Sequence, residues 1–476
     1  MTPDEFRRHG HALIDWIAKY FETVEQYPVL PAVKPGDLVR ALPPSAPEHA
    51  EAFEAVIGDL ERLILPAATH WNHPGFFAYF AITGSAPGVL MELVSAALNQ
   101  QAMVWRTSPA ATELEEVTLR WLARLMHLPD QVEGVIYDTA SISTMHALAG
   151  ARDAAVPGVR ARGLAGRPDV PELRVYCSEQ AHSSVDKAVI ALGLGQSALC
   201  RIPVDLSFRM RVGELQDAIR EDREAGRWPV AVVATVGTTS STSVDDVAAI
   251  ATICHREAIW LHVDAAYAGV MAIVPEFEWM RAGFDLADSI VVNPHKWLFT
   301  PFDLSVLFTR RMETLLQAFS VTPEYLKTPE AAAARSLMDT GVQLGRRFRS
   351  LKLWAILRYF GAEGIRDRLR EHVRLAQLVG AWVDANPDFE RVAPVPFSVV
   401  CFRAVPRGVP ADAASLDALN GRILDRVNTS GQVFLSHTKL DGKYVIRLAV
   451  GNLRTQEQHV RRAWDLITGA LRAEAP

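Results

Sequence analysis

One lysine follows an apolar run together with residues that could bind an anion. Lys296 lies in Asn293–Trp297, directly after the run Ser289–Val292. The chain has only eight lysines among its 49 basic residues, so a reaction that needs a primary amine has few candidates. A lysine amine can form a Schiff base with a carbonyl compound. Lys296 is therefore the first candidate for covalent chemistry.

A carboxylate occupies the same kind of position one run earlier in the chain. Asp264 directly follows the apolar run Ile259–Val263 and precedes Ala265–Tyr267. A carboxylate at the end of a buried strand is costly unless it is paired. Its position therefore indicates a charged partner or a ligand.

Three more apolar runs also end in polar residues. Gly134–Tyr137 is followed by Asp138–Ser141, Leu173–Cys177 by Ser178–Ser184 with His182, and Val230–Val236 by the hydroxyl-rich Gly237–Ser243. Small residues at the start of a helix present N–H groups to an anion. Taken singly, the three stretches are equally typical of a helix cap, a structural histidine and a turn.

The five runs predict the element type that would bring these groups together. Runs of four to eight β-forming residues between helices are typical of buried parallel strands in an α/β domain. Ligands bind outside the carboxyl ends of such strands. We therefore expect the lysine, the carboxylate, the histidine and the anion-binding turns to lie along one edge of a sheet.

Pyridoxal phosphate is the cofactor that needs this set of groups. Its enzymes use a lysine for the Schiff base and a carboxylate that keeps the pyridine nitrogen protonated. A ring that stacks on the pyridine and a helix N-terminus that binds the phosphate complete the site. The residue types at the five strand ends therefore predict a pyridoxal-phosphate enzyme.

A metal-dependent hydrolase is the competing prediction from some of the same residues. His262 and Asp264, or His70 and His73, have spacings that could bind a metal ion. No second ligand pair at a consistent spacing supports this interpretation, and a metal hydrolase does not need Lys296.

The sequence divides into three regions that differ in their pattern of predicted helices and strands. Residues 1–83 begin with a capping box at Thr2–Glu5 and an amphipathic helix, and a second helix is expected over 48–65 after a proline-rich connector. This helical arm is expected to pack on a partner subunit, although packing on its own subunit fits the pattern equally well. Residues 84–360 form the large α/β domain, and 361–476 a smaller α+β domain with strands such as Ser398–Phe402 and Tyr444–Leu448.

Composition excludes several other classes of protein. Hydrophobic residues make up 49% and charged residues 22%, which is ordinary for a globular chain. The net charge of −6 comes without a basic block, so nothing favours nucleic-acid or acidic-membrane binding. Four scattered cysteines and a charged N-terminus without an apolar core predict reduced thiols and a cytoplasmic location.

These motifs resemble the group II pyridoxal-phosphate decarboxylases, and within them the aromatic-L-amino-acid decarboxylases. The resemblance runs nearly end to end and rests on several long motifs in the same order: His70–Trp71, Phe77–Phe80, Gln180–Val185, His262–Gly269, Asn293–Trp297 and Leu344–Ser350. It implies a type I aminotransferase-like fold, with a mostly parallel sheet and helices on both of its faces. It also implies an obligate homodimer with the active site at the subunit interface.

The resemblance implies a role for each matching residue. Lys296 would form the Schiff base, Asp264 would pair with the ring nitrogen, and His182 would stack on the ring near the substrate. Further residues would hold the cofactor: Ala140, Ser141, Thr239, Asn293 and His295. Others would line the substrate pocket, with Met103 coming from the second subunit: Trp71, Tyr79, Phe80, Ile82 and Met103. Arg447 matches a family arginine that could contact an anion, or it forms a surface salt bridge.

The sequence departs from the family at a loop tyrosine. That tyrosine is thought to return a proton to Cα after CO2 leaves, but residues 333–343 contain none. An ungapped alignment puts Leu337 at its position, a gapped one puts Thr340 there, and Tyr325 matches a different family residue. In relatives without it, dioxygen can react instead and give an aldehyde, ammonia and peroxide. A second departure is Ala81–Ile82, where animal members have proline and threonine.

The expected function is decarboxylation of an aromatic L-amino acid to its amine. Because the loop tyrosine is missing, the first alternative is an aldehyde synthase, which would consume oxygen and release ammonia and peroxide. His182 or a bound water could still supply the proton. The second alternative is a non-catalytic binding protein, against which the retention of Lys296 and Asp264 argues.

Overall fold

The structure is a computed structural model that describes residues 1–321, 330, 334–410 and 412–474. The chain divides into two compact units. Unit 1 comprises residues 1–81, 381–390 and 402–476, and unit 2 comprises residues 82–380 and 391–401. The sequence-based boundaries at residues 83 and 360 stay predictions.

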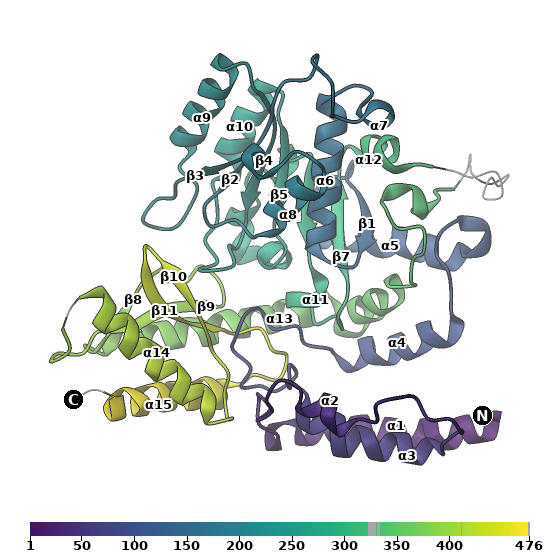
Figure 1. Ribbon diagram of the computed structural model, residues 1–476, viewed down its shortest axis with the longest axis vertical. Helices are drawn as coiled ribbons and strands as arrows, with labels where there is room; N and C mark the ends of the chain where they lie inside the picture. The colour runs from purple at the N-terminus through teal and green to yellow at the C-terminus, as the bar shows by residue number, and fades with distance from the viewer. Residues whose placement is uncertain (322–329, 331–333, 411, 475–476) are drawn as a thin grey trace. The chain divides into compact units, whose positions relative to one another are not determined.

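Unit 2 contains a seven-stranded sheet with helices on both of its faces, as expected (Figure 1). Its spatial order is β1-β7-β6-β5-β4-β2-β3. The strands are β1 (Glu133–Tyr137), β2 (Leu173–Ser178), β3 (Leu199–Ile202), β4 (Trp228–Thr235), β5 (Trp260–Asp264), β6 (Ser289–Val292) and β7 (Ser305–Thr309).

Only β7 runs against the other strands of this sheet. It pairs antiparallel with both β1 and β6, whereas β2, β3, β4, β5 and β6 form parallel pairs. The sheet is therefore mostly parallel, as predicted, but Gly134–Tyr137 pairs with an antiparallel neighbour, because β7 lies between β1 and β6. Since β7 is reversed relative to both neighbours, β1 still points the same way as β6. Six strands thus end at the same edge.

Helices of unit 2 cover this sheet. Helix α6 packs against α8 and α12 (Figure 1). Its buried side chains join those of β2, β4 and β5 in the core. The helices of this unit are α4 (Ala86–Leu98), α5 (Pro109–Leu125), α6 (Ala140–Ala155), α7 (Val159–Arg162), α8 (Ser184–Ala191), α9 (Val212–Glu224), α10 (Val247–Glu257), α11 (Pro294–Trp297) and α12 (Met312–Phe319). Helix α13 (Ser350–Ala385) continues into unit 1.

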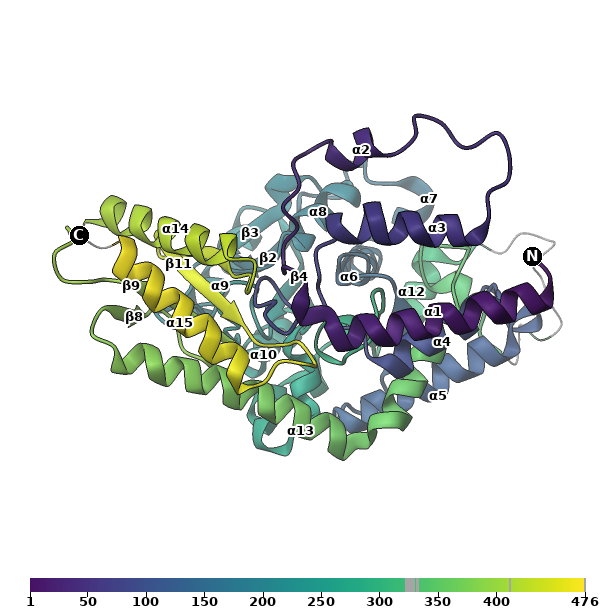
Figure 2. The same cartoon turned by 90° about the horizontal axis from the view of Figure 1, so that it is seen from below.

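Unit 1 begins with the expected capped helix. In α1 (Pro3–Thr23) the Thr2 hydroxyl accepts the Glu5 amide and the Glu5 carboxylate accepts the Thr2 amide. After the short α2 (Asp37–Ala41), α3 (Phe53–Asp59) lies beside α1 (Figure 2), and Trp16 of α1 donates to Glu61 at 2.9 Å. The helix expected over 48–65 starts at Phe53, five residues later than predicted, because residues 42–52 form bends and irregular chain that ends with extended backbone at Ala52.

The rest of unit 1 is a four-stranded sheet with two helices. The strand order is β10-β11-β9-β8, and helices α14 and α15 lie side by side next to β11 (Figure 2). The elements are β8 (Phe389–Arg391), β9 (Val399–Ala404), α14 (Ala413–Thr429), β10 (Ser436–Leu440), β11 (Lys443–Ala449) and α15 (Glu457–Glu474). The unit boundary crosses β8 and β9. Within the described residues, no helix is both long and apolar enough to span a membrane.

Candidate active site

The segments that carry Asp264 and Lys296 are joined through their backbones. Strands β5 and β6 pair in parallel, with Asp264 opposite Val291. Beyond the strands, the Ala265 amide donates to the Val291 carbonyl at 3.1 Å and the Asn293 amide donates to the Ala266 carbonyl at 3.0 Å. Lys296 follows on the single turn of α11. The predicted lysine and carboxylate therefore lie on adjacent strand ends.

The Asp264 side chain is buried at the carboxyl end of β5. It is 6% exposed, and its Oδ1 accepts the Ala266 amide at 3.1 Å. This bond leaves further acceptor capacity on the carboxylate, since each ionised oxygen can take more than one donor. A protonated pyridine nitrogen is a donor that could bond to this carboxylate.

His182 interacts electrostatically with both of these groups. Burial lowers the pKa of His182, the charge of Asp264 opposes this shift and the charge of Lys296 adds to it. The structure therefore brings the three predicted catalytic residues together. The Ser184 amide donates to His182 Nδ1 at 3.1 Å, so the neutral ring carries its proton on Nε2.

His295 lies beside Lys296 on α11 and is also neutral. Burial and the charge of Lys296 lower the pKa of His295 to about 3. The Leu304 amide donates to His295 Nδ1 at 2.9 Å, which leaves Nε2–H as the donor. The ring packs against Phe302, with 4.8 Å between the centroids.

Helix α6 starts where the anion-binding turn was predicted. Ala140 and Ser141 form its first turn, and Thr139 is the N-cap residue. The first N–H groups of a helix have no acceptor within the helix and favour a negative charge. The first turn of α6 has no side-chain cap from Thr139.

The hydroxyl-rich stretch after β4 forms a turn closed by its own hydrogen bonds. The Ser243 amide donates to Thr238 Oγ1 at 3.0 Å and the Thr242 amide to the Thr238 carbonyl at 2.8 Å. Thr239 is exposed within this turn. The turn interpretation is thus confirmed for the neighbouring hydroxyls, and Thr239 is accessible for a contact with a cofactor.

Buried polar atoms at three strand ends fit a bound polar cofactor. Ser178 is the last residue of β2, Thr235 is the last residue of β4, and Asn293 directly follows β6. The atoms concerned are Ser178 Oγ, Thr235 Oγ1 and Asn293 Oδ1. All three are buried without a hydrogen-bond partner among the described residues. Buried polar atoms are normally paired, so unused capacity along one edge suits a ligand rich in donors and acceptors. The residues at this edge therefore fit pyridoxal phosphate.

Sequence reasoning did not select Ser178 and Thr235 as site residues. Ser178 directly follows the predicted strand Leu173–Cys177, and Thr235 is the polar residue within the apolar run Val230–Val236. A polar side chain at or near the end of a predicted buried strand was the available signal.

Three of the predicted pocket residues belong to unit 1 and lie around Arg447. Arg447 donates to the Tyr79 carbonyl, and its guanidinium lies 4.6 Å from the centre of the Phe80 ring. The rings of Trp71 and Tyr79 stack at 6.0 Å. Arg447 is only 3% exposed, so its interpretation as a surface salt bridge was wrong. A buried cation with two aromatic neighbours is consistent with a role in ligand binding.

The other two pocket residues, Ile82 and Met103, belong to unit 2. Met103 packs with Val104 and Met338. The Met338 amide also donates to the Met103 carbonyl at 3.0 Å. Met103 is thus attached to the stretch in which the family carries its loop tyrosine.

Both positions that align with the loop tyrosine are buried. Leu337 is 5% and Thr340 1% exposed, and the Thr340 hydroxyl donates to the Leu337 carbonyl at 2.7 Å. The only candidate proton donor of the two is therefore already engaged. Tyr325 and Ala333 lie outside the described residues.

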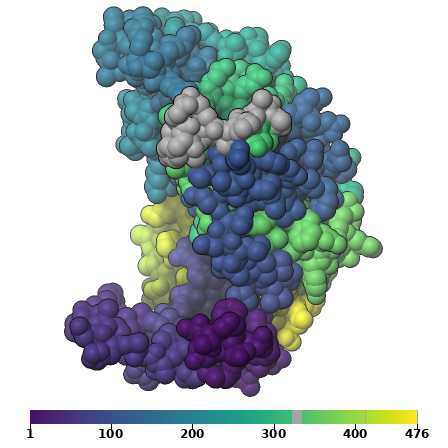
Figure 3. Space-filling model, turned by 90° about the vertical axis from the view of Figure 1, so that its right-hand side faces the viewer, coloured from purple at the N-terminus to yellow at the C-terminus, as the bar shows by residue number. Residues whose placement is uncertain are grey.

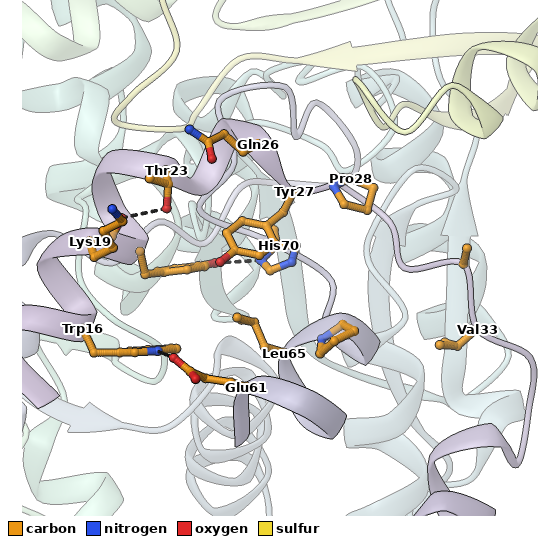
Figure 4. A pocket seen from close by; sticks show the side chains of 13 residues that line it. Trp16, Lys19, Thr23, Gln26, Tyr27, Pro28, Val33, Glu61, Leu65 and His70 are labelled. Carbon is orange, nitrogen blue, oxygen red and sulfur yellow. Dashed lines mark hydrogen bonds between the residues drawn. The ribbon is translucent and has the colours of Figure 1, made fainter. Parts of the chain in front are cut away.

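The histidines of the metal hypothesis have other partners. Hydroxyls of Thr144 and Ser289 bond the two ring nitrogens of His262. His70 Nδ1 bonds the Tyr20 hydroxyl at 2.9 Å in an aromatic cavity of about 750 Å³ in unit 1 (Figure 4). His73 Nδ1 accepts the Gly75 amide. Across the described residues, no group of three or more His, Cys, Asp or Glu side chains could hold a metal ion.

Comparison with known families decides the class of protein. The family model of the pyridoxal-dependent decarboxylase conserved domain matches residues 35–405. The chain belongs to this family. The match covers all the predicted cofactor residues, so the chemistry deduced at the sheet edge and the family agree: this decarboxylase uses pyridoxal phosphate.

Relatives of this decarboxylase act on aromatic amino acids. Phenylacetaldehyde synthase of Arabidopsis thaliana is 42% identical over 98% of this chain and 96% of its own. Aromatic-L-amino-acid decarboxylase of Sus scrofa is 39% identical, again covering 98% of this chain and 96% of its own. A crystal structure of Oryza sativa TDC with PLP and tryptamine covers 100% of this chain and 99% of its own, with a TM-score of 0.96 and 36% identity.

Proposed function

We propose that this decarboxylase converts an aromatic L-amino acid to the corresponding amine and CO2. One observation carries the proposal: Asp264 and Lys296 follow adjacent, backbone-bonded strands at the carboxyl edge of the unit 2 sheet, and the charges of both act on the pKa of His182. The buried, unpaired oxygens of Ser178, Thr235 and Asn293 support a cofactor at this edge.

Each residue has a distinct task in this mechanism. Pyridoxal phosphate supplies, when bound, a carbonyl group that condenses with amines and a ring that withdraws electrons from the substrate Cα. Lys296 would hold the cofactor covalently through its side-chain amine. The Asp264 carboxylate would keep a proton on the ring nitrogen, which preserves the electron-withdrawing power of the ring. The first turn of α6, with Ala140 and Ser141, would bind the phosphate.

His182 is the residue best suited to handle a proton. Partial burial and the charge of Lys296 lower its pKa, which favours the neutral ring, and the Ser184 amide bond to Nδ1 leaves the ring proton on Nε2. Nε2–H can donate a hydrogen bond to the substrate carboxylate. After CO2 has left, the same atom can deliver a proton to Cα, and solvent can replace that proton. This route needs no loop tyrosine.

The aromatic substrate class rests on two lines of support. Trp71, Tyr79 and Phe80 supply aromatic surface, and Arg447 is a buried cation in contact with Tyr79 and Phe80. Relatives named as decarboxylases of tyrosine and tryptophan cover almost the whole chain. A Catharanthus roseus tryptophan decarboxylase with bound L-tryptophan has a TM-score of 0.92 and is 35% identical, with 99% of each chain covered.

A specific observation favours a second product. Leu337 has no acidic proton, and the Thr340 hydroxyl is buried and bonded to a carbonyl. If no proton reaches Cα in time, dioxygen can oxidise the Cα–N bond by two electrons and be reduced to hydrogen peroxide. Hydrolysis then releases the aldehyde and ammonia, so one amino acid, one O2 and one water give aldehyde, CO2, ammonia and H2O2. The 42% identical phenylacetaldehyde synthase supports this alternative.

We also propose a homodimer with active sites at the subunit interface. Helix α4 exposes an apolar face with Leu90 at 45%, Leu93 at 51% and Leu98 at 52%. The blue segment that contains this helix lies on the side of unit 2 that faces the viewer in Figure 3. An exposed patch of this kind is typical of a subunit interface. Helix α1 has no buried residue, which supports packing of this arm on the partner. None of the four cysteines forms a disulfide, which supports a cytoplasmic location.

Incubation with a panel of amino acids tests the proposed function. The loaded enzyme is given L-tryptophan, L-phenylalanine, L-tyrosine and L-dihydroxyphenylalanine, and CO2, amine, aldehyde, ammonia and peroxide are quantified. A molar amount of amine equal to that of CO2 supports the amine as the product. Molar amounts of aldehyde and peroxide equal to that of CO2, with oxygen consumed, support the aldehyde as the product. No CO2 from any of the four would refute the substrate class.

A further inference from the structure

Residues 340–343 lie against the end of β1 and the first turns of α6. The Tyr137 hydroxyl donates to the Thr340 carbonyl. The Val342 amide donates to His146 Nε2 at 3.3 Å, and the Gln343 side-chain amide donates to Asp138 Oδ2 at 3.0 Å. Three bonds from different residues thus fix one short segment, which we name the anchored segment (residues 340–346).

The contact surface of this segment is dry and closely packed. Tyr137 is 3% and His146 0% exposed, and their rings meet edge to face at 4.4 Å. Burial lowers the pKa of His146 to about 4, so the ring is neutral at pH 7 and accepts on Nε2. A Cβ on Gly341 would lie 2.5 Å from His146 Cε1. The close approach therefore requires glycine at this position.

Asp138 links the anchored segment to the start of α6. While its Oδ2 accepts Gln343, its Oδ1 accepts the Thr139 amide at 2.6 Å. Thr139 is the N-cap residue of α6. One carboxylate thus bonds both the anchored segment and the helix end to which we assign the cofactor phosphate.

The far end of the segment is held by a buried ion pair. Arg346 donates to Glu115 of α5 at 2.8 Å and to the Ile136 carbonyl of β1 at 2.6 Å. The same Glu115 oxygen accepts the Ile136 amide at 2.9 Å. Both charged side chains are at most 5% exposed. A buried pair that also bonds backbone groups holds its surroundings firmly, because separating the partners would leave a buried charge.

We propose that Tyr137, Asp138 and His146 are positioning residues that couple the anchored segment to the phosphate-binding end of α6. Neither the Tyr137 hydroxyl nor the His146 ring needs to touch substrate for this role. The proposal rests on the proposed cofactor site, since α6 matters here only as the element that binds the phosphate. Coupling is reciprocal: if the segment stabilises the helix end, the bound cofactor must stabilise the segment by the same factor.

The coupling gives the departure from the family a structural consequence. Thr340, one of the two positions that align with the missing tyrosine, belongs to the anchored segment, and its carbonyl and hydroxyl are both bonded there. The residue at this position is therefore held by the same contacts that hold the phosphate end of α6.

Amide hydrogen exchange in the cofactor-free protein tests the coupling without any activity. Tyr137→Phe removes only the hydroxyl that bonds Thr340, and Gly341→Ala pushes the segment away from His146. Each should speed exchange of residues 340–346 about 10-fold, which is the loss expected for one buried hydrogen bond. The β5 peptide serves as the internal reference and should not change. Tyr176→Phe is the matched control, because it removes a buried hydroxyl bond to Asp222 elsewhere in the same sheet.

The second measurement is cofactor affinity. Titration of the cofactor-free variants with pyridoxal phosphate should give a weaker Kd for Tyr137→Phe and Gly341→Ala, and an unchanged one for Tyr176→Phe. In the wild type, the cofactor should slow amide exchange of the anchored segment. The factor should equal the factor by which the variants lose affinity for the cofactor. Equal acceleration in the β5 peptide, or affinity that matches the control, would overturn the coupling. A wild type that binds the cofactor but releases no CO2 would instead contradict the proposed function.

Discussion

The Asn293 amide donates a hydrogen bond of 3.0 Å to the Ala266 carbonyl. This bond joins the turn after β5, which follows Asp264, to the turn after β6, which precedes Lys296. Backbone bonds thus hold together the two segments that carry the carboxylate and the amine. Substitution of either side chain should therefore change the chemistry and leave the sheet intact.

Replacing Lys296 by alanine should abolish attachment of the cofactor. The expected result is loss of the visible absorbance band of the lysine-bound cofactor, with normal circular dichroism. Lys187→Ala is the matched control, because Lys187 is an exposed lysine on α8 that also acts on the pKa of His182. An unchanged band in Lys296→Ala would refute the assignment.

Replacing Asp264 by asparagine should lower kcat by on the order of 100-fold, as expected when one preorganised electrostatic contact is lost. The change keeps the shape of the side chain but removes the charge that holds a proton on the ring nitrogen. Rates are compared at full cofactor occupancy, verified by absorbance. Near-normal turnover at full occupancy would contradict the role of Asp264.

Much of this edge could be predicted because its signals are local. Each of the five runs was recognisable by its β-forming residues, and strands β1, β2, β4, β5 and β6 lie where the runs predicted them, within one or two residues. Strands β3 and β7 were missed, and with β7 the antiparallel pairing of β1. The pairing of β1 depends on which strand lies between β1 and β6 in the sheet. That position is set by long-range contacts, which local sequence patterns do not show.

Acid should weaken the fold between pH 6.5 and 5. In unit 2, burial lowers the pKa of His146 and His262 from 6.5 to about 4. It lowers the pKa of His295 from 6.5 to about 3. In this range the unfolded chain binds protons that the folded chain does not, so the free energy of unfolding falls as the pH falls. Each histidine should contribute about 2 kcal/mol of loss at pH 5.

One carboxyl group acts in the opposite direction. Burial raises the pKa of Asp245 to about 6, so the folded chain binds this proton first and gains stability as the pH falls. Three histidines outweigh one carboxyl group. The urea midpoint of the cofactor-free protein should therefore be lower at pH 5 than at pH 7.5, and an equal or higher midpoint at pH 5 would contradict the burial of these rings.

A charge on the exposed face of α4 should dissociate the proposed dimer. Leu93→Glu places a carboxylate within the apolar patch, where a partner subunit could not solvate it. Light scattering should give the mass of one chain for this variant and of two chains for the wild type. Leu206→Glu is the control, since Leu206 is 95% exposed outside this patch. A dimeric Leu93→Glu variant would exclude this face as the interface.

The anchored segment shows what the sequence could not provide. The alignment left Leu337 and Thr340 as alternatives, and no local pattern links either position to Tyr137 or His146, about 200 residues away. Their contacts depend on where β1 and α6 lie in the folded chain. The same holds for Arg447, whose burial follows from its contacts with Tyr79 and Phe80.

Release of labelled CO2 from carboxyl-labelled L-aromatic amino acids tests the central claim most directly. The account predicts cofactor-dependent release from at least one of phenylalanine, tyrosine, tryptophan and dihydroxyphenylalanine by the wild type, and none by Lys296→Ala. Absence of labelled CO2 from a wild type that is fully loaded with cofactor, or equal release by Lys296→Ala, would contradict it.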